Sequence, residues 1–335
     1  METRIINQES VPRLLPMAEC IDCMREVLTD LAKGLCQLPL RNIMWLPEKV
    51  GALGLMPSYW KSHDLIGLKA VSYFPGNAGT EYDSHQGAVL LYEAKRGRLL
   101  AIVDATSITA IRTAAVSAVA TKLLARSDAC RLAIIGAGVQ ARVHLEAMRL
   151  CRDITSIRVC GKSLDRAKRF AKRESDRHSI KVDPVASVKE AVADADIICT
   201  TTSSTVPVLK GEWIKPGTHI NAIGASTAPA RELDAHAVRI SRLFVDLRES
   251  ALEEAGDFLL AKKEGAVNDD HIQGEIGELL AGKAIGRTSP DDITLFKSVG
   301  LAVEDLASAY HIFNNAVRQN AGMKIEFGGA RRETD

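Results

Sequence analysis

The most specific chemical signal in this 335-residue sequence is a short glycine-containing segment. Gly136, Gly138 and Ala141 have the spacing G-x-G-x-x-A and directly follow the apolar run 132–135. In a dinucleotide-binding turn the first glycine permits the tight turn, the second lets the backbone approach a pyrophosphate, and the small third residue allows close helix–strand packing. A helix that begins here presents free N–H groups to the phosphates. The spacing predicts a dinucleotide site that includes Gly136, Gly138, Val139 and Gln140.

The residues after the next predicted strand bear on which dinucleotide is bound. Folds that bind NAD carry an acidic residue at this position, where it binds the ribose hydroxyls. In this sequence Lys162 and Ser163 stand there, with Arg166 one turn further on, and no Asp or Glu occupies the position. A cation and a hydroxyl suit a ribose 2′-phosphate, so we predict a preference for NADP(H), with NAD(H) as the alternative. A solvated loop lysine is the plainer interpretation of Lys162.

Hydroxyl side chains follow another predicted strand, 195–199, in the segment Thr200, Thr201 and Thr202. Ligands of open parallel sheets bind beyond the carboxyl ends of the strands. We therefore predict that these threonines bind the ribose or phosphate groups of the cofactor. The alternative is a polar loop that satisfies its own hydrogen bonds.

Three cations stand in apolar surroundings and need an anion. Arg41 follows Pro39-Leu40, Lys69 lies within an apolar predicted strand, and Arg112 lies in a helix of small and apolar residues. An unpaired charge in such places is costly. Each cation is therefore expected to meet an anion, and an internal salt bridge is the plainer interpretation for any one of them. Because a partly desolvated lysine has a lowered pKa, Lys69 is also a candidate for proton exchange near neutral pH.

The elements that position these residues change character along the chain. The first third contains a predicted helix at 17–33, strands at 65–71, 88–92 and 99–103, and a helix at 109–124. Strands then alternate with helices, which predicts a doubly wound parallel sheet of the α/β class. Its predicted strands are 132–135, 157–160, 195–199, 219–223 and 243–246, and its helices include 139–150 and 165–173. Helices are predicted again at 250–264 and 300–318.

Composition narrows the class of protein. Lys and Arg total 43 and Asp and Glu total 42, so the net charge of +1 predicts neither a nucleic-acid nor a membrane partner. From the hydropathy pattern we expect neither an apolar run of the ~20 residues that span a bilayer nor a secretory signal. The 7 cysteines form an odd, scattered set, which favours a cytoplasmic location. Cys20 and Cys23 form a C-x-x-C, but no second ligand pair accompanies it, so we expect no metal site.

With these features in place, the sequence resembles the ornithine cyclodeaminase/mu-crystallin family over nearly its whole length. The resemblance rests on several short motifs taken together. They are Gly67-Leu68-Lys69, Pro75-Gly76-Asn77, His85-Gln86-Gly87, Asp104-Ala105-Thr106, Thr109 to Ala115, Gly136 to Ala141, Ile220 to Ser226, Gly274 to Glu278 and Thr294 to Gly300.

The resemblance implies a Rossmann-type domain, 119–299, inserted into a second α+β domain of 1–118 with 300–335. The second domain would bind substrate and form a homodimer. The family's pattern matches Arg41, Lys69 and Arg112 to the substrate carboxylate, with Arg112 also near the cofactor. It places Ser84 near the nicotinamide, and Ser298 and Val299 near substrate and nicotinamide.

One segment departs from the cyclodeaminases of the family. Where they carry an Asp and then a Lys that handle the distal amine of ornithine, this sequence has Ser226 and Ala230. A hydroxyl lacks the charge to hold a second ammonium. We therefore predict a reductase of small α-imino acids or an amino-acid dehydrogenase. An ornithine or lysine cyclodeaminase and a crystallin-like binding protein without turnover remain the alternatives.

Overall fold

The computed structural model describes residues 2–77 and 79–329 and divides the chain into two compact units. The first comprises Met1–Arg112 and Leu301–Asp335, and the second comprises Thr113–Gly300. The boundaries that the family resemblance implies are 118/119 and 299/300. No change of pattern marks position 112, because helix α3 (Ala105–Leu124) runs through it without interruption.

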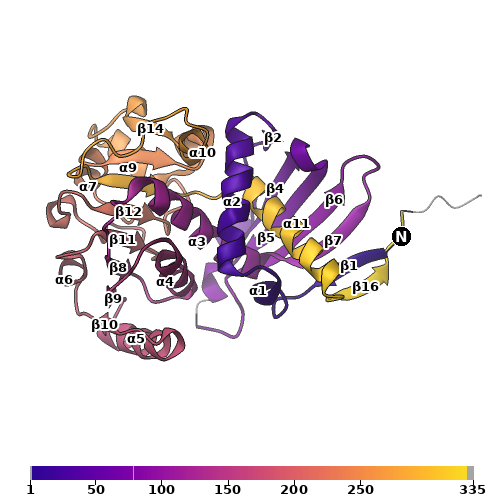
Figure 1. Cartoon of the computed structure of the whole chain (residues 1–335), viewed down its shortest axis with the longest axis horizontal. Coiled ribbons are helices and arrows are strands. Elements are labelled where there is room, and N and C mark those ends of the chain that lie inside the picture. The colour runs from indigo at the N-terminus through magenta and orange to yellow at the C-terminus, as the bar shows by residue number, and fades with distance from the viewer. Residues whose placement is uncertain (1, 78, 330–335) are drawn as a thin grey trace, which may run out of the picture. The chain divides into compact units, whose positions relative to one another are not determined.

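The first unit is built on a mostly antiparallel sheet with the order β16-β1-β7-β6-β5-β4-β2, in which β3 also pairs with β4 (Figure 1). Strand β1 joins the sheet as the parallel neighbour of β7, and β16 pairs antiparallel with β1. The first and last strands are therefore neighbours in one sheet. The strands are β1 (Glu2–Ile6), β2 (Cys36–Gln37), β3 (Asn42–Trp45), β4 (Ala52–Trp60), β5 (Leu65–Tyr73), β6 (His85–Glu93), β7 (Leu99–Asp104) and β16 (Met323–Glu326).

Helix α11 (Ala302–Arg318) packs across β4 to β7, next to α2 (Met17–Ala32), and Figure 1 shows both in front of the sheet. The short α1 (Val11–Leu14) packs on α11. Leu65, Gly67 and Lys69 share the buried face of β5, since side chains alternate along a strand. A methyl group on Gly67 would lie 3.0 Å from Leu306 of α11. Glycine at this position thus allows α11 to approach the strand that carries Lys69.

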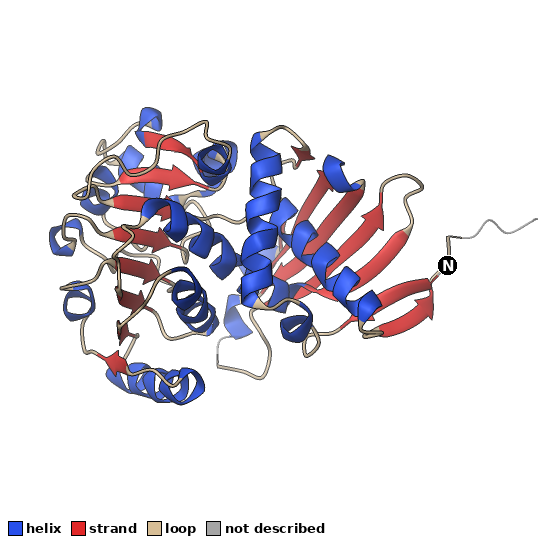
Figure 2. Ribbon diagram, in the orientation of Figure 1, coloured by secondary structure: helices blue, strands red, loops and turns tan. Residues whose placement is uncertain are grey.

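The second unit contains a parallel sheet with the order β10-β9-β8-β11-β12-β15-β13-β14, surrounded by helices (Figure 2). The strand order reverses between β8 and β11, as in Rossmann folds. The predicted fold class is confirmed. The strands are β8 (Arg131–Ile135), β9 (Ser156–Cys160), β10 (Val182–Pro184), β11 (Ile197–Thr200), β12 (His219–Ala222), β13 (Arg242–Val245), β14 (Ile272–Glu275) and β15 (Thr294–Lys297).

Three short helices of this unit were not predicted, and α5 (Leu164–His178) runs beyond the predicted end at 173. One predicted helix is also divided. The predicted helix 250–264 is two helices, α8 (Arg248–Glu254) and α9 (Gly256–Lys263), which meet at Ala255. At this junction Gly256 approaches the carbonyl oxygen of Ala230, which would lie 1.9 Å from an added methyl group. The other helices are α4 (Val139–Cys151), α5 (Leu164–His178), α6 (Val188–Val192), α7 (Ala235–Arg239) and α10 (Ile276–Leu280). Short 3₁₀ turns lie at Pro47–Lys49, Lys61–His63, Pro75–Asn77, Gly211–Trp213 and Asp269–His271.

Contrary to the expectation that no segment could span a bilayer, helix α3 is long and apolar enough to do so by length and composition alone. Its apolar window is 78% buried inside the protein, and its hydrophobic residues point in all directions rather than to one face. A helix that is apolar all round and buried in this way is typical of a protein core.

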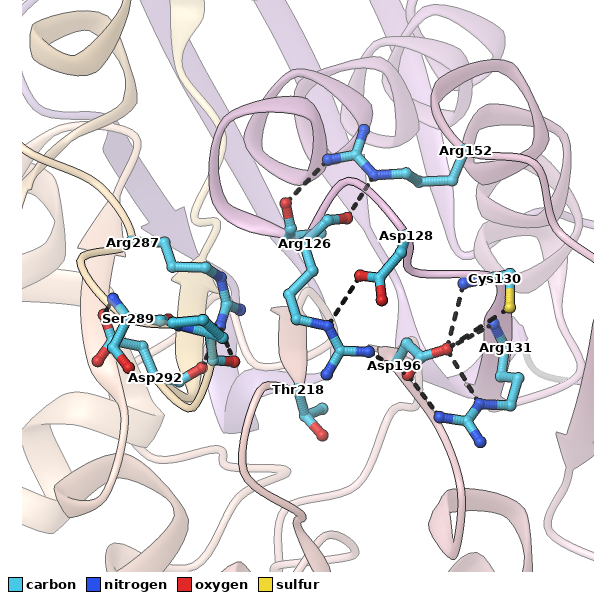
Figure 3. A network of polar contacts seen from close by, with 12 residues as sticks. Arg126, Asp128, Cys130, Arg131, Arg152, Asp196, Thr218, Arg287, Ser289 and Asp292 are labelled. Atoms are coloured by element: carbon cyan, nitrogen blue, oxygen red, sulfur yellow. Dashed lines mark hydrogen bonds and ion pairs between the residues drawn. The ribbon is translucent and has the colours of Figure 1, made fainter.

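A buried carboxylate ties together the amino ends of two parallel strands (Figure 3). Asp196, directly before β11, accepts hydrogen bonds from the guanidinium groups of Arg126 and Arg131 and from the backbone nitrogens of Cys130 and Arg131. These contacts hold the pKa of Asp196 at about 2, although burial alone would raise it. The cluster lies at the amino ends of the strands, opposite the end where such sheets bind ligands, which assigns it a structural role.

Candidate functional site

The predicted dinucleotide turn lies at the reversal of strand order in the second unit. Gly136 follows β8 with a φ of +121°, which side chains other than glycine rarely adopt. A methyl group on Gly136 would lie 2.5 Å from the Thr201 hydroxyl oxygen, on the loop after β11. The Thr201 hydroxyl itself donates to the carbonyl oxygen of Ile135 at 3.1 Å. Only glycine therefore allows the loops after β8 and β11 to approach this closely.

The start of helix α4 has the features that a pyrophosphate needs. No side chain caps this helix at Gly138, whose added methyl group would meet open space. The side-chain oxygen of Gln140 is buried and has no hydrogen-bond partner among the described residues. Val139 is exposed, whereas Ala141 is buried against the sheet. Free N–H groups and a close backbone approach fit a pyrophosphate. The unsatisfied Gln140 oxygen needs a donor, such as a ribose hydroxyl of the same dinucleotide.

The three residues predicted to select NADP(H) lie around the start of α5. The hydroxyl of Ser163 accepts a hydrogen bond from the backbone nitrogen of Arg166 at 3.4 Å and caps the helix. Lys162 and Arg166 are exposed. The structure thus gives Ser163 a local structural contact and leaves two cations at the solvent surface after β9.

Two of the predicted threonines, Thr200 at the end of β11 and Thr202 beyond it, are held by an acid that was not predicted from the sequence. Glu232 is fully buried and accepts hydrogen bonds from the Thr200 hydroxyl at 2.7 Å and the Thr202 backbone nitrogen at 2.6 Å. It also accepts one from the backbone nitrogen of Gly224, after β12, at 2.7 Å. The hydroxyl of Thr200 therefore has an internal partner rather than a surface position. Glu232 joins the carboxyl ends of β11 and β12.

Two further buried charges surround Glu232. Asp257 of α9 accepts hydrogen bonds from the backbone nitrogens of Glu232 and Leu233, and it lies 3.1 Å from the Lys297 ammonium of β15. Burial, and then the charge of Asp257, raise the pKa of Glu232. These groups fix the ends of β11, β12 and β15 with charged hydrogen bonds, which are stronger than neutral ones.

The segment Ser298–Gly300 is positioned by a carboxylate at the end of β13. Asp246 accepts hydrogen bonds from the backbone nitrogens of Val299 and Gly300, both at 2.7 Å, and from the Ser298 hydroxyl at 3.4 Å. Ser226 lies half-buried in the loop after β12. The residues predicted near substrate and nicotinamide thus stand at the carboxyl ends of neighbouring strands, where ligands of such sheets bind.

The first unit brings two of the three predicted cations together around two acids. Lys69 of β5 lies 2.9 Å from one carboxylate oxygen of Asp305, and Arg112 of α3 lies 3.2 Å from the other. Arg112 also pairs with Glu304 at 2.7 Å. All four side chains are at most 5% exposed. Internal salt bridges, one of the two interpretations of these cations from the sequence, are therefore present. They compensate two positive charges with two negative ones.

The ammonium group of Lys69 keeps one donor. Asp305 and the hydroxyl of Thr109, at 3.2 Å, accept two of its three hydrogens, and no other acceptor within the described residues reaches it. Burial lowers the pKa of Lys69 to about 8, and Asp305 opposes this effect. Burial alone would raise the pKa of Asp305, but Lys69 and Arg112 hold it below its ordinary value. Lys69 is therefore charged at neutral pH and close to its titration range.

The other two predicted residues of the first unit, Arg41 and Ser84, are half-buried. Arg41, half-buried between β2 and β3, is close enough that its charge lowers the pKa of Lys69. Ser84 is half-buried before β6, and its hydroxyl lies 3.2 Å from a ring nitrogen of His85. Glu304 and Asp305 were not among the residues predicted from the sequence. Their signal was available, since two adjacent acids in an apolar helix need partners just as Arg112 does.

These features agree with a whole-chain comparison. The sequence model of the ornithine cyclodeaminase/mu-crystallin family matches residues 1–320 of this chain. The chain belongs to this family.

Within the ornithine cyclodeaminase/mu-crystallin family the chain is similar to several reductases and dehydrogenases. It is 41% identical to the mouse (Mus musculus) ketimine reductase mu-crystallin over 83% of this chain and 84% of that protein. The structure of Thermococcus litoralis Δ1-pyrroline-2-carboxylate reductase with NADH and L-proline has a TM-score of 0.93 and 39% identity, and covers 96% and 99% of the two chains. An archaeal alanine dehydrogenase dimer with bound NAD has a TM-score of 0.92 and 35% identity, and covers 98% and 100%.

These relatives agree with the branch of the family that the sequence predicts. Two of them are named as reductases, one of a ketimine and one of Δ1-pyrroline-2-carboxylate, and the third is named as an alanine dehydrogenase. The two related structures contain bound NADH and NAD, which supports the binding of a nicotinamide cofactor by this chain.

Proposed function

We propose that the protein is an NAD(P)H-dependent reductase of small α-imino acids, which converts a C=N group next to a carboxylate into the amino acid. The observation that carries the proposal is the buried cluster of Lys69, Arg112 and Asp305, in a chain that also has a dinucleotide turn at Gly136. An imino acid requires a donor for its carboxylate, a donor for its nitrogen and a source of hydride. The first unit contains residues suited to the two donor roles, and the second contains a turn suited to the cofactor that would supply the hydride.

The residues of the first unit bind and orient the imino acid in this proposal. Arg112 and Arg41 offer guanidinium groups, which bind a carboxylate with two parallel hydrogen bonds. The ammonium group of Lys69 donates its remaining hydrogen to the substrate. Because the pKa of Lys69 is about 8, this group also supplies the proton that the imine nitrogen gains. Reduced nicotinamide, when bound by the second unit, supplies the hydride that the imine carbon accepts.

In the second unit, the turn at Gly136 and Gly138 and the start of α4 would bind the pyrophosphate, with Val139 and Gln140 beside it. Thr201 and Thr202, on the loop after β11, would lie beside the cofactor. The nicotinamide and the substrate are proposed to be bordered by Ser84, Ser226, Ser298 and Val299. We propose NADP(H) as the preferred cofactor, because Lys162 and Arg166 are exposed cations after β9 and no acid stands there. NAD(H) is the alternative, and comparison of the Michaelis constants for NADPH and NADH decides between them.

An assay of cofactor oxidation tests the proposed reaction. Purified protein is given NADPH with Δ1-pyrroline- or Δ1-piperideine-2-carboxylate, with pyruvate plus ammonia or methylamine, and with oxaloacetate plus ammonia. We expect oxidation with at least one of these imines and formation of the corresponding amino acid. Ammonia release from ornithine without net cofactor consumption would instead indicate a cyclodeaminase. Cofactor binding without any turnover would indicate a binding protein.

We also propose that the protein forms a homodimer through the first unit. Strand β3 carries three exposed apolar side chains, Ile43 (39%), Met44 (55%) and Trp45 (47%), and pairs with β4 on one side. Exposed apolar strands at a sheet edge commonly mark an interface. The archaeal alanine dehydrogenase relative is a dimer. Light scattering should give twice the mass of the chain, and Trp45→Glu should give a monomer.

A cytoplasmic location is part of the proposal. All seven cysteines are free thiols, and the set is odd and scattered along the chain. Such cysteines suit a reducing compartment. Cell fractionation should find the protein with the cytoplasmic enzymes.

A further inference from the structure

One carboxylate in the first unit contacts both buried cations at once. The two oxygens of Asp305 are divided between Lys69, at 2.9 Å, and Arg112, at 3.2 Å. Asp305 is 1% exposed and lies in the first turn of α11, where the positive end of the helix dipole also favours a carboxylate. The position of α11 is set by close packing on Gly67, two residues before Lys69 on the same face of β5.

We propose that Asp305 is a positioning residue for the imino-acid reaction: it keeps Lys69 charged and fixes the distance between the Lys69 ammonium and the Arg112 guanidinium. The inference rests on the proposed function of these cations and adds a residue that does not itself contact the substrate. Because Asp305 leaves one ammonium hydrogen of Lys69 without an acceptor among the described residues, it orients that hydrogen without consuming it.

The charged groups around Lys69 give Asp305 this role rather than its neighbour Glu304. Arg112 from α3 and Arg41 from the segment before β3 both disfavour a charged lysine, as does burial. His85 of β6 also lies within electrostatic range of Lys69. Burial lowers the pKa of the His85 imidazole, and the charge of Lys69 lowers it further. Asp305 is the group that favours the ammonium form. Glu304 pairs with Arg112, and the structure records no hydrogen bond or ion pair between Glu304 and Lys69.

The test compares Asp305→Asn with Glu304→Gln, a matched control that removes the other carboxylate of the cluster. For each protein, kcat/KM for Δ1-pyrroline-2-carboxylate is measured from pH 5 to 10 with saturating NADPH. Wild type should lose activity above about pH 8. In Asp305→Asn this alkaline limb should move down by at least about 1 pH unit, because an opposite charge contributes shifts of this size. Glu304→Gln should lower the rate but keep the wild-type alkaline limb. Lys69→Arg should have no such limb, because a guanidinium does not lose its proton in this pH range.

A binding measurement separates this inference from the proposed function. The probe is pyrrole-2-carboxylate, whose ring nitrogen does not titrate in this range, and its Kd is measured by calorimetry across the same pH values. Wild type should lose affinity above about pH 8 and Asp305→Asn at a lower pH, whether or not the protein reduces an imine. The melting temperature of each variant shows that it is folded.

Three results would overturn the inference. One is an Asp305→Asn profile with the wild-type limb and merely a lower rate, which would make Asp305 a structural residue. Another is a limb that persists in Lys69→Arg. The third is wild-type protein that does not bind pyrrole-2-carboxylate at any pH. Failure of imine reduction with the expected shift in binding would instead refute the proposed reaction and support the positioning role.

Discussion

The carboxylate of Glu232 accepts a hydrogen bond from the backbone nitrogen of Gly224 at 2.7 Å. A methyl group on Gly224 would lie 1.9 Å from the carbonyl oxygen of Thr202 and 2.7 Å from the Glu232 carboxylate. The loops after β11 and β12 are therefore in backbone contact, and a buried acid joins them. This contact controls the shape of the sheet edge at which the cofactor is proposed to bind.

Glu232→Gln should destabilise the second unit and weaken cofactor binding together. The amide keeps the size of the side chain, but its NH2 group opposes one of the three donors that Glu232 accepts. We expect a loss of about 2 kcal/mol in the free energy of unfolding, and a higher Kd for NADPH in the folded protein. Urea denaturation and fluorescence titration measure the two effects. Unchanged stability would show that Glu232 does not hold these loops.

Gly138→Ala should separate cofactor binding from folding. Its added methyl group meets open space, so the melting temperature should stay close to that of wild type. The same methyl group would obstruct a pyrophosphate, and the Kd for NADPH should rise at least about tenfold, or about 1.4 kcal/mol. Gly97→Ala, at a turn in the first unit with a positive φ and open space around it, is the control that should leave the Kd unchanged. Equal affinities in Gly138→Ala and wild type would contradict the assigned site.

Lys162 and Arg166 should determine the preference between the two cofactors. Replacing both with alanine removes the cations proposed to bind the 2′-phosphate, while the cap at Ser163 is retained. We expect the KM for NADPH to rise roughly tenfold or more, as for loss of a charged hydrogen bond, with little change in the KM for NADH. Steady-state kinetics with both cofactors gives the ratio. A wild-type protein that prefers NADH would refute the NADP(H) assignment.

Asp196 should make the stability of the second unit sensitive to acid. Its pKa is about 2 in the folded protein against an ordinary value of 3.8, so the folded state binds the proton less readily than the unfolded state. The resulting stabilisation, about 2 kcal/mol, is complete above about pH 4 and is lost as the pH falls toward 2. Asp196→Asn should be less stable at pH 7 and lack this dependence. Asp194→Asn, which removes an exposed carboxylate nearby, should keep it.

The Rossmann sheet and the dinucleotide turn could be predicted because their signals are local. A strand, a glycine turn and a helix occupy one short stretch of sequence around Gly136. Strand β15 escaped prediction because its four residues end in Lys297, a charge that the sequence alone does not place in a buried strand. Lys297 is tolerated there because Asp257, from a different helix, lies 3.1 Å away.

The partners of the predicted cations could not be identified from local sequence for a related reason. Lys69 and Asp305 are 236 positions apart in the chain, and Arg112 and Asp305 are 193 apart. The sequence indicates that Lys69 and Arg112 need anions, but the pairing depends on the packing of α11 over β5. This packing brings the two cations and the two acids of α11 into one cluster.

Deuteride transfer measures the central claim most directly. The protein is incubated with Δ1-pyrroline-2-carboxylate and NADPH that carries deuterium at C4 of the nicotinamide, using each of the two C4 stereoisomers, and the product is analysed by mass spectrometry and NMR. The account predicts proline with one deuterium at Cα from one of the stereoisomers, and no such product from Lys69→Ala that still binds NADPH. Proline without deuterium at Cα from either stereoisomer, or equal transfer by Lys69→Ala, would contradict it.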